Sequence, residues 1–128
     1  MIKFLKTLLK LDFKIEEFYY NIGEILSYAD LAITRAGAGT INDLIIHNIP
    51  SIIMPLPYSI NNHQYYNAKF LSDKNAAILI DENNFDVNIN SNILKELIIN
   101  KNKRNLMIKE LSKIHIPSAN MIMLSKIK

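Results

Sequence analysis

The sequence contains no cysteine, so disulfides and thiolate metal sites are excluded. The three histidines, His47, His63 and His115, lack the mutual spacing of a metal site, and there is no Asp-x-Asp pair. No apolar run approaches the roughly 20 residues that cross a membrane. The Gly-x-Ser-x-Gly elbow and the Ser-His-Asp order of hydrolases are also missing. We therefore expect no metal, no other cofactor, no membrane span and no hydrolase site.

A strong charge of either sign is absent too, because 15 basic and 12 acidic residues leave a net charge of +3. This excess is too small to indicate nucleic-acid binding by itself. The densest basic run, Lys101, Lys103 and Arg104, is interpreted as the solvated start of a helix, and no RNA or DNA motif accompanies it. With 49% hydrophobic and 21% charged residues, the 128-residue chain is typical of one globular domain. We predict no nucleic-acid partner.

Residues 1–13 form a basic and apolar segment that predicts a helix. Phe4, Leu8 and Leu11 recur at the spacing of a helix that packs one face on a core. The alternative is a helix that lies on a membrane surface. The segment lacks the long apolar centre and the cleavage site of a signal peptide.

Strand and helix patterns alternate between residues 14 and 80, and the chain is helical after the polar loop at residues 81–84. The predicted strands are residues 14–18, 31–34, 51–54 and 76–80, and a last helix is predicted from Pro117. Strand 31–34 is expected to be covered on both faces, as in a parallel sheet. These patterns indicate an α/β fold, a parallel sheet with flanking helices, in a single domain over residues 1–128 whose helical C-terminal tail spans residues 81–128.

One helix start has a recognisable cap. Asn21 with Glu24 three residues later resembles a capping box, so a helix is predicted to begin there. We expect this helix to bury Ile22, Ile25 and Leu26.

The segment from Arg35 to Asp43 carries small residues after a buried strand. Gly37 and Gly39 allow unusual dihedrals and a close approach of the backbone to a ligand. We expect Thr40 to open a helix, whose unpaired first amides and dipole form a cradle for phosphate. Asp43, one turn later, is able to accept two hydrogen bonds from the hydroxyls of a ribose. The alternative is that Thr40 and Asp43 form a capping box. Arg35 is able to orient the loop, bind phosphate or pair with a surface acid.

A second polar cluster follows the next buried strand. His63, Gln64 and Asn67 gather at a predicted helix start, where their side chains are able to bond sugar hydroxyls or phosphate. The alternative for His63 is a cap or loop residue. In an open parallel sheet, ligands bind at the edge where these two clusters lie.

Several blocks of the sequence occur in the order seen in the MurG family of bacterial glycosyltransferases. The blocks are Arg35-Ala-Gly-Ala-Gly-Thr40, Asp43-Leu44, Pro50 to Pro57, Asn62-His-Gln64, Asn67-Ala68 and Ala76-Ala77. The chain resembles that family over roughly residues 14–128. The resemblance implies the C-terminal, donor-binding half of a Rossmann-like GT-B enzyme that transfers N-acetylglucosamine from UDP-N-acetylglucosamine to undecaprenyl-linked muramyl-pentapeptide.

The resemblance also implies roles for individual residues. Asp43 stands where the family has a glutamate that holds the ribose hydroxyls, and it is one methylene shorter. The turn Gly37, Ala38, Gly39 and Thr40 is expected to bind the diphosphate. His63 and Gln64, with Asn67 in support, are expected to bind the acetamido sugar. Phe18 and the backbone of Tyr19 are expected to bind the uracil. No metal is implied.

Two central strands and the acceptor domain of the family, with its catalytic base, have no counterpart in the sequence. We therefore expect strand 31–34 to have a bare edge and the chain to be inactive alone. By the same resemblance we expect it at the cytoplasmic face of the membrane. Two other functions remain open: a nucleotide-sugar-binding subunit that docks on a separate N-terminal polypeptide, and a basic RNA-binding module.

Overall fold

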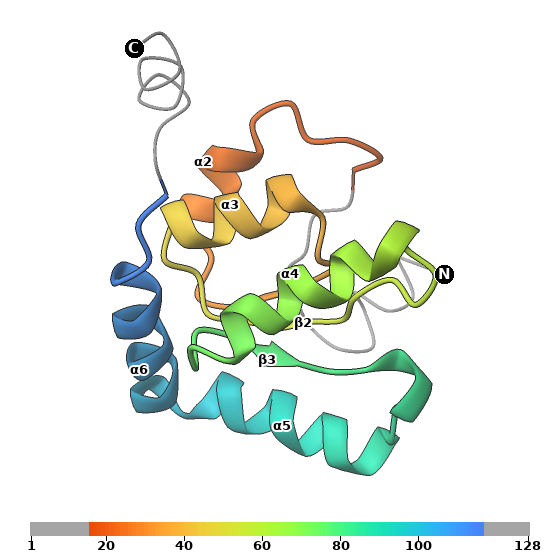
Figure 1. Ribbon diagram of the computed structural model, residues 1–128. Helices are drawn as coiled ribbons and strands as arrows, with labels where there is room; N and C mark the ends of the chain where they lie inside the picture. The colour runs from red at the N-terminus through yellow and green to blue at the C-terminus, as the bar shows by residue number, and fades with distance from the viewer. Residues whose placement is uncertain (1–15, 117–128) are drawn as a thin grey trace, which may run out of the picture.

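The computed structural model describes residues 16–116, which form a small parallel sheet with helices around it (Figure 1). The strands are β1 (Ala32–Thr34), β2 (Ser51–Ile53) and β3 (Ile78–Leu79), in the order β1-β2-β3 and all parallel. The α-helices are α2 (Ile22–Ser27), α3 (Ala38–Ile46), α4 (His63–Ser72), α5 (Val87–Ile99) and α6 (Lys101–Ser112), with 3-10 turns η1 (Ile60–Asn62) and η2 (Glu82–Asn84). The predicted α/β class and three of the four predicted strands are confirmed.

Strand β2 lies at the centre of the sheet and is buried along its whole length. Ile53 packs in a cluster with residues of α3 and α4, whereas Ile52 packs in a second cluster with residues of α5 and α6. Because successive side chains of a strand point to opposite faces, the two clusters mark the two faces of the sheet. The view in Figure 1 shows α3 and α4 on one side of the strands and α5 on the other.

Asparagine performs the backbone role that glycine often has in other proteins. Asn48 after α3 and Asn75 after α4 have φ values of 53° and 57°. The amides of Ile49 and Ala76 then reach back to the carbonyls of Leu44 and Leu71 at 2.9 and 3.0 Å. This six-to-one bond is the Schellman ending of a helix, and asparagine tolerates its left-handed residue. Each ending turns the chain directly toward the next strand, β2 or β3.

The predicted strand 14–18 is wrong in its described part. Residues 16–18 form no strand, and the Phe18 side chain is 70% exposed. A strand requires a hydrogen-bonded neighbour, and in residues 16–116 β1 pairs with β2 alone. The expected bare edge of strand 31–34 is therefore confirmed within the described residues.

Two burial predictions near that edge are wrong. Ile33 of β1 is 57% exposed, because α5 and α6 cover β2 and β3 but leave this face of β1 open. In α2, only Leu26 packs on the core, whereas Ile22 and Ile25 are exposed. The cap of α2 is confirmed, since the Asn21 side chain accepts a hydrogen bond from the Glu24 amide at 3.4 Å.

The predicted helices at residues 1–13 and from Pro117 lie outside the described residues. None of the helices within residues 16–116 has the length and apolar character that crossing a bilayer requires. The loops that follow the parallel strands β1, β2 and β3 all leave the sheet at its carboxyl edge.

Candidate functional site

The turn between β1 and α3 differs from the sequence-based prediction in two ways, in its helix cap and in its glycine dihedrals. Helix α3 begins at Ala38 with Gly37 as its N-cap, so Thr40 is the third helical residue and not the cap. The alternative of a Thr40–Asp43 capping box is therefore wrong. Gly37 has φ −62° and ψ 148°, and none of the chain's three glycines, all of them in the described part, has a positive φ. The unusual glycine dihedrals expected here are not found.

The glycines leave the start of α3 open. A Cβ built on Gly39 would meet no atom within 4 Å, and one on Gly37 would meet only the Thr40 hydroxyl, at 3.8 Å. Within residues 16–116, no group accepts a hydrogen bond from the amides of Ala38, Gly39 or Thr40. The first amides of a helix carry the positive end of its dipole. The turn therefore presents three donors to open space, which suits an anion.

Asp43 lies one turn further along α3 and is half-buried. Its backbone carbonyl accepts the His47 amide at 3.0 Å, while its carboxylate has no hydrogen-bond partner among the residues that the structure describes. A carboxylate three residues after Thr40 shares its side of the helix. Asp43 is therefore free to accept hydrogen bonds from a ligand beside the turn.

Two amide side chains of α4 reach across to the same turn. The Gln64 oxygen accepts from the Ala36 amide at 3.2 Å and from the Leu56 amide at 2.9 Å. The Asn67 amide group donates to the Ala36 carbonyl at 2.9 Å. The fold thus brings Gln64 and Asn67 to the turn, as the sequence predicted, but it uses them to hold backbone.

His63 is the first residue of α4, after Asn62 as its cap, and its side chain is exposed. Asn61 and Asn62 both have left-handed φ values, 51° and 54°, which turn the chain sharply into the helix. The His63 ring thereby stands at the start of α4, at the carboxyl edge of the sheet.

The contacts of Arg35 distinguish between the three roles predicted for it. Its Nη1 donates to the Glu82 carboxylate at 2.8 Å and to the carbonyls of Met54 and Pro55 at 3.2 and 3.5 Å. It therefore pairs with a surface acid and ties together the loops after β1, β2 and β3. The hydrogen bond from Arg35 lowers the pKa of Glu82, and the same contact raises the pKa of Arg35. Sequence reasoning missed Glu82, because nothing local marks a partner 47 residues away.

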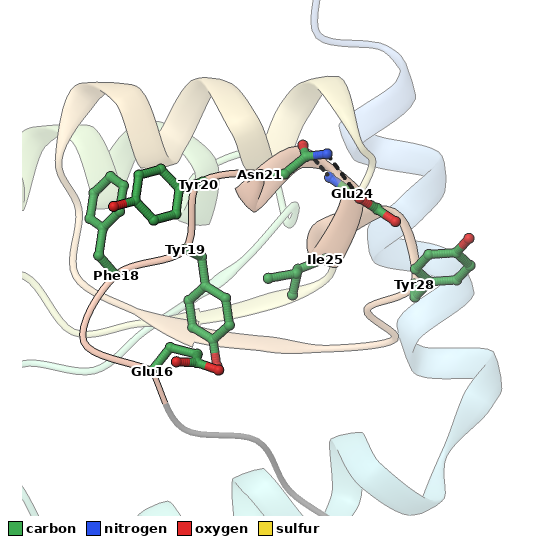
Figure 2. Close-up of a pocket in the computed structure, with 8 residues that line it drawn as sticks. All are labelled: Glu16, Phe18, Tyr19, Tyr20, Asn21, Glu24, Ile25 and Tyr28. Carbon is green, nitrogen blue, oxygen red and sulfur yellow. Dashed lines mark hydrogen bonds between the residues drawn. The ribbon is translucent and has the colours of Figure 1, made fainter.

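The predicted uracil residues line a pocket of their own. Phe18 and Tyr19 line an open pocket of about 510 Å³ (Figure 2), and no residue of the turn from Gly37 to Asp43 lines it. Phe18 and Tyr20 meet edge to face, with ring centroids 5.3 Å apart. The full lining is Glu16, Phe18, Tyr19, Tyr20, Asn21, Glu24, Ile25 and Tyr28. Of these aromatic residues, Tyr20 and Tyr28 were not foreseen.

The described residues show no group of three or more histidine, aspartate or glutamate side chains placed to hold a metal ion. Among the residues described, the candidate site therefore consists of backbone amides, the unpaired Asp43 carboxylate, polar side chains at the start of α4 and an aromatic pocket that the turn does not line.

Comparisons with known proteins show the family of the chain. Residues 2–120 match the family model described as the glycosyltransferase family 28 C-terminal domain. The UDP-N-acetylglucosamine--N-acetylmuramyl-(pentapeptide) pyrophosphoryl-undecaprenol N-acetylglucosamine transferase of Vesicomyosocius okutanii is 41% identical over 106 residues, which are 83% of this chain and 31% of that protein. The protein of the same name from Rickettsia massiliae is 40% identical over 99 residues, 77% of this chain and 26% of that protein.

The fold has solved counterparts as well. The crystal structure of Acinetobacter baumannii MurG superposes with a TM-score of 0.78 at 27% identity, covering 89% of this chain and 33% of that one. Spinosyn forosaminyltransferase SpnP, with a TM-score of 0.56 at 18% identity, shares the fold. This chain spans about a third or less of the length of these relatives. With nearly all of its residues matched, the chain belongs to the glycosyltransferase family 28 C-terminal domain family.

Proposed function

We propose that this chain is the donor-binding part of an inverting glycosyltransferase and that it holds UDP-N-acetylglucosamine. The observation that carries the proposal is the open N-terminus of α3, where three amides and the carboxylate of Asp43, one turn away, have no partner among residues 16–116. The two curated relatives are transferases whose names include this donor sugar and an undecaprenol-linked acceptor. A nucleoside diphosphate needs donors for its phosphates and an acceptor for its ribose hydroxyls.

In this proposal each part of the donor has its own contacts. The diphosphate lies on the amides of Ala38, Gly39 and Thr40, and the ribose lies on Asp43. The acetamido sugar extends toward His63 at the start of α4. The uracil contacts Phe18 and the backbone of Tyr19.

The reaction proposed is the attack of the muramyl 4-hydroxyl on the sugar's anomeric carbon, with UDP as the leaving group. The bond between that carbon and the diphosphate breaks while the new glycosidic bond forms, and negative charge develops on the diphosphate. Preorganised amides at a helix start stabilise such charge. We propose that no metal is needed, because those amides face the phosphates directly.

In our proposal, residues outside this chain bind the lipid-linked acceptor and supply the base that takes the hydroxyl proton. The relatives are about three times longer, and β1 has an unpaired edge within the described residues. We propose that a polypeptide carrying the remaining parts completes the enzyme, at the cytoplasmic face of the membrane.

Titration calorimetry of the full chain with UDP and UDP-N-acetylglucosamine tests donor binding. We expect both to bind, with ADP and GDP weaker and with no change on adding a chelator. The absence of heat from either uridine nucleotide would refute the proposal. Transferase activity is then expected only when a polypeptide with the acceptor-binding parts is added.

A further inference from the structure

The peptide unit before the Gly37 cap is held from both sides by one helix. Ala36 is completely buried, and neither its amide nor its carbonyl can reach water. Its amide donates to the Gln64 oxygen at 3.2 Å, and its carbonyl accepts from the Asn67 amide group at 2.9 Å. Gln64 and Asn67 are three residues apart on α4, so both face the same turn.

Gln64 also fixes a second loop. Its oxygen accepts from the Leu56 amide at 2.9 Å, in the loop after β2. Two backbone amides can only donate, so the atom they share must be the carbonyl oxygen of Gln64. These two bonds fix the orientation of the Gln64 side-chain amide, and both lone pairs of its oxygen are occupied by backbone donors. The loops after β1 and β2 thus meet on a single oxygen atom.

We propose that Gln64 and Asn67 are positioning residues. Their hydrogen bonds to Ala36, called the clamp below, hold the first amides of α3 in the positions that bind the diphosphate. The inference rests on the proposed function, and it assigns Gln64 a positioning role in addition to any contact between its side-chain NH2 group and the sugar. A buried peptide group that loses its partner is costly, so removing the clamp shifts Ala36. Gly37 follows immediately, and its carbonyl opens the first hydrogen bond of α3. A shift of Ala36 therefore displaces the donors that face the phosphates.

This role predicts a pattern across ligands that a sugar contact would not give. UDP has the diphosphate but no sugar, so a sugar-reading residue leaves its affinity unchanged. A residue that positions the diphosphate donors alters the affinities for UDP and for UDP-N-acetylglucosamine by the same factor. The two roles are therefore separated by one comparison.

Gln64→Met, which keeps the length of the side chain but removes the acceptor, provides the test. We expect it to weaken both UDP and UDP-N-acetylglucosamine by about tenfold, as measured by calorimetry on the full chain. Tyr66→Phe, an exposed change on the same helix, is the matched control and is expected to leave both affinities unchanged. A Gln64→Met protein that binds UDP normally and loses only UDP-N-acetylglucosamine would overturn the inference.

Amide hydrogen exchange measured by NMR gives a readout that does not depend on any ligand. The Ala36 and Leu56 amides are expected to be protected in the unchanged chain, exposed in Gln64→Met and protected again in Gln64→Glu, which restores an acceptor oxygen. Retained protection in Gln64→Met would overturn the inference whatever the affinities. An unchanged chain that binds no UDP, yet shows this exchange pattern, overturns the proposed function and leaves the clamp a purely structural contact.

Discussion

The β1–α3 turn and the aromatic segment from Glu16 to Tyr28 are both proposed to contact one nucleotide, yet they are built differently. The turn is held by hydrogen bonds between residues 28 and 31 positions apart, from Gln64 and Asn67 to Ala36. In the aromatic segment, Asn21 and Ser27 bond to Glu24, three residues away. Long-range bonds fix the turn relative to the sheet, whereas bonds within one turn of α2 fix only that helix.

The two regions also differ in exposure. The residue that precedes the turn, Ala36, is fully buried, whereas Phe18, Tyr20 and Tyr28 are between 70% and 98% exposed. We infer that the diphosphate end of the site is preformed and that the uracil end is completed when the ligand packs on these rings. Binding energy should therefore depend more on the turn than on the aromatic segment, because preformed donors lose little entropy on binding.

Gly39→Leu is expected to have the largest effect. The new side chain enters the open space before α3 and blocks the diphosphate from its donors, each worth about 1.5–3 kcal/mol for a charged group. UDP affinity should fall by more than about 100-fold in calorimetry. Thermal stability should not fall, because a Cβ at position 39 meets no atom within 4 Å and because leucine has a higher helix propensity than glycine. Gly23→Ala in α2 is the control, and UDP binding by Gly39→Leu at normal affinity would contradict the site.

Asp43→Ala should come next, with a loss of about tenfold in UDP affinity from the removed ribose contact. The same change should affect 2′-deoxyuridine diphosphate less, because that ligand lacks one of the two hydroxyls. Asp43→Glu, which restores the family residue, serves as the control and should bind both ligands. Equal losses for the two nucleotides would place Asp43 away from the ribose.

Phe18→Ala is expected to cost about threefold in UDP affinity, because an exposed ring contributes only a partial stacking surface. Affinity for inorganic pyrophosphate should not change, since that ligand reaches only the turn. Tyr58→Ala, another highly exposed aromatic change, is the control. A loss as large as that of Gly39→Leu would reverse the comparison between the two regions.

How much the sequence could predict differs between the same two regions. The strands that became β1, β2 and β3 were found because each is a short apolar run ended by glycine, proline or a polar loop. The position of Asp43 and the amide-rich start of α4 followed from local spacing. These features depend on neighbours in the sequence, which periodicity and turn residues record.

The errors concern contacts between distant segments. Residues 14–18 have the composition of a strand, but residues 16–18 have no partner strand in the described chain. The exposure of Ile33 depends on where α5 and α6 pack, which no local pattern encodes. The bonds from the Ala36 and Leu56 amides to Gln64 were not foreseen either, because the sequence does not distinguish one backbone amide from another.

Glu82→Gln should have the smallest effect. It tests the ion pair with Arg35, which connects the loops after β1, β2 and β3. The Arg35 and Glu82 side chains are 47% and 42% exposed, so water and salt screen their attraction. Arg35 also keeps its bonds to the Met54 and Pro55 carbonyls. We expect a small fall in Tm at neutral pH and less than about a twofold change in UDP affinity, because a screened surface pair contributes little.

The pH dependence identifies the cause of that small effect. The bond from Arg35 lowers the pKa of Glu82 below its ordinary value of 4.5, so the folded state favours the charged carboxylate. The pair therefore stabilises the fold above that value and loses this contribution as the pH falls through the lowered pKa. The difference in Tm between the original chain and Glu82→Gln should shrink on acidification and also in high salt. A difference that stays constant with pH would mean that the glutamine disturbs η2 itself, because Glu82 is the only titratable group in which the two chains differ.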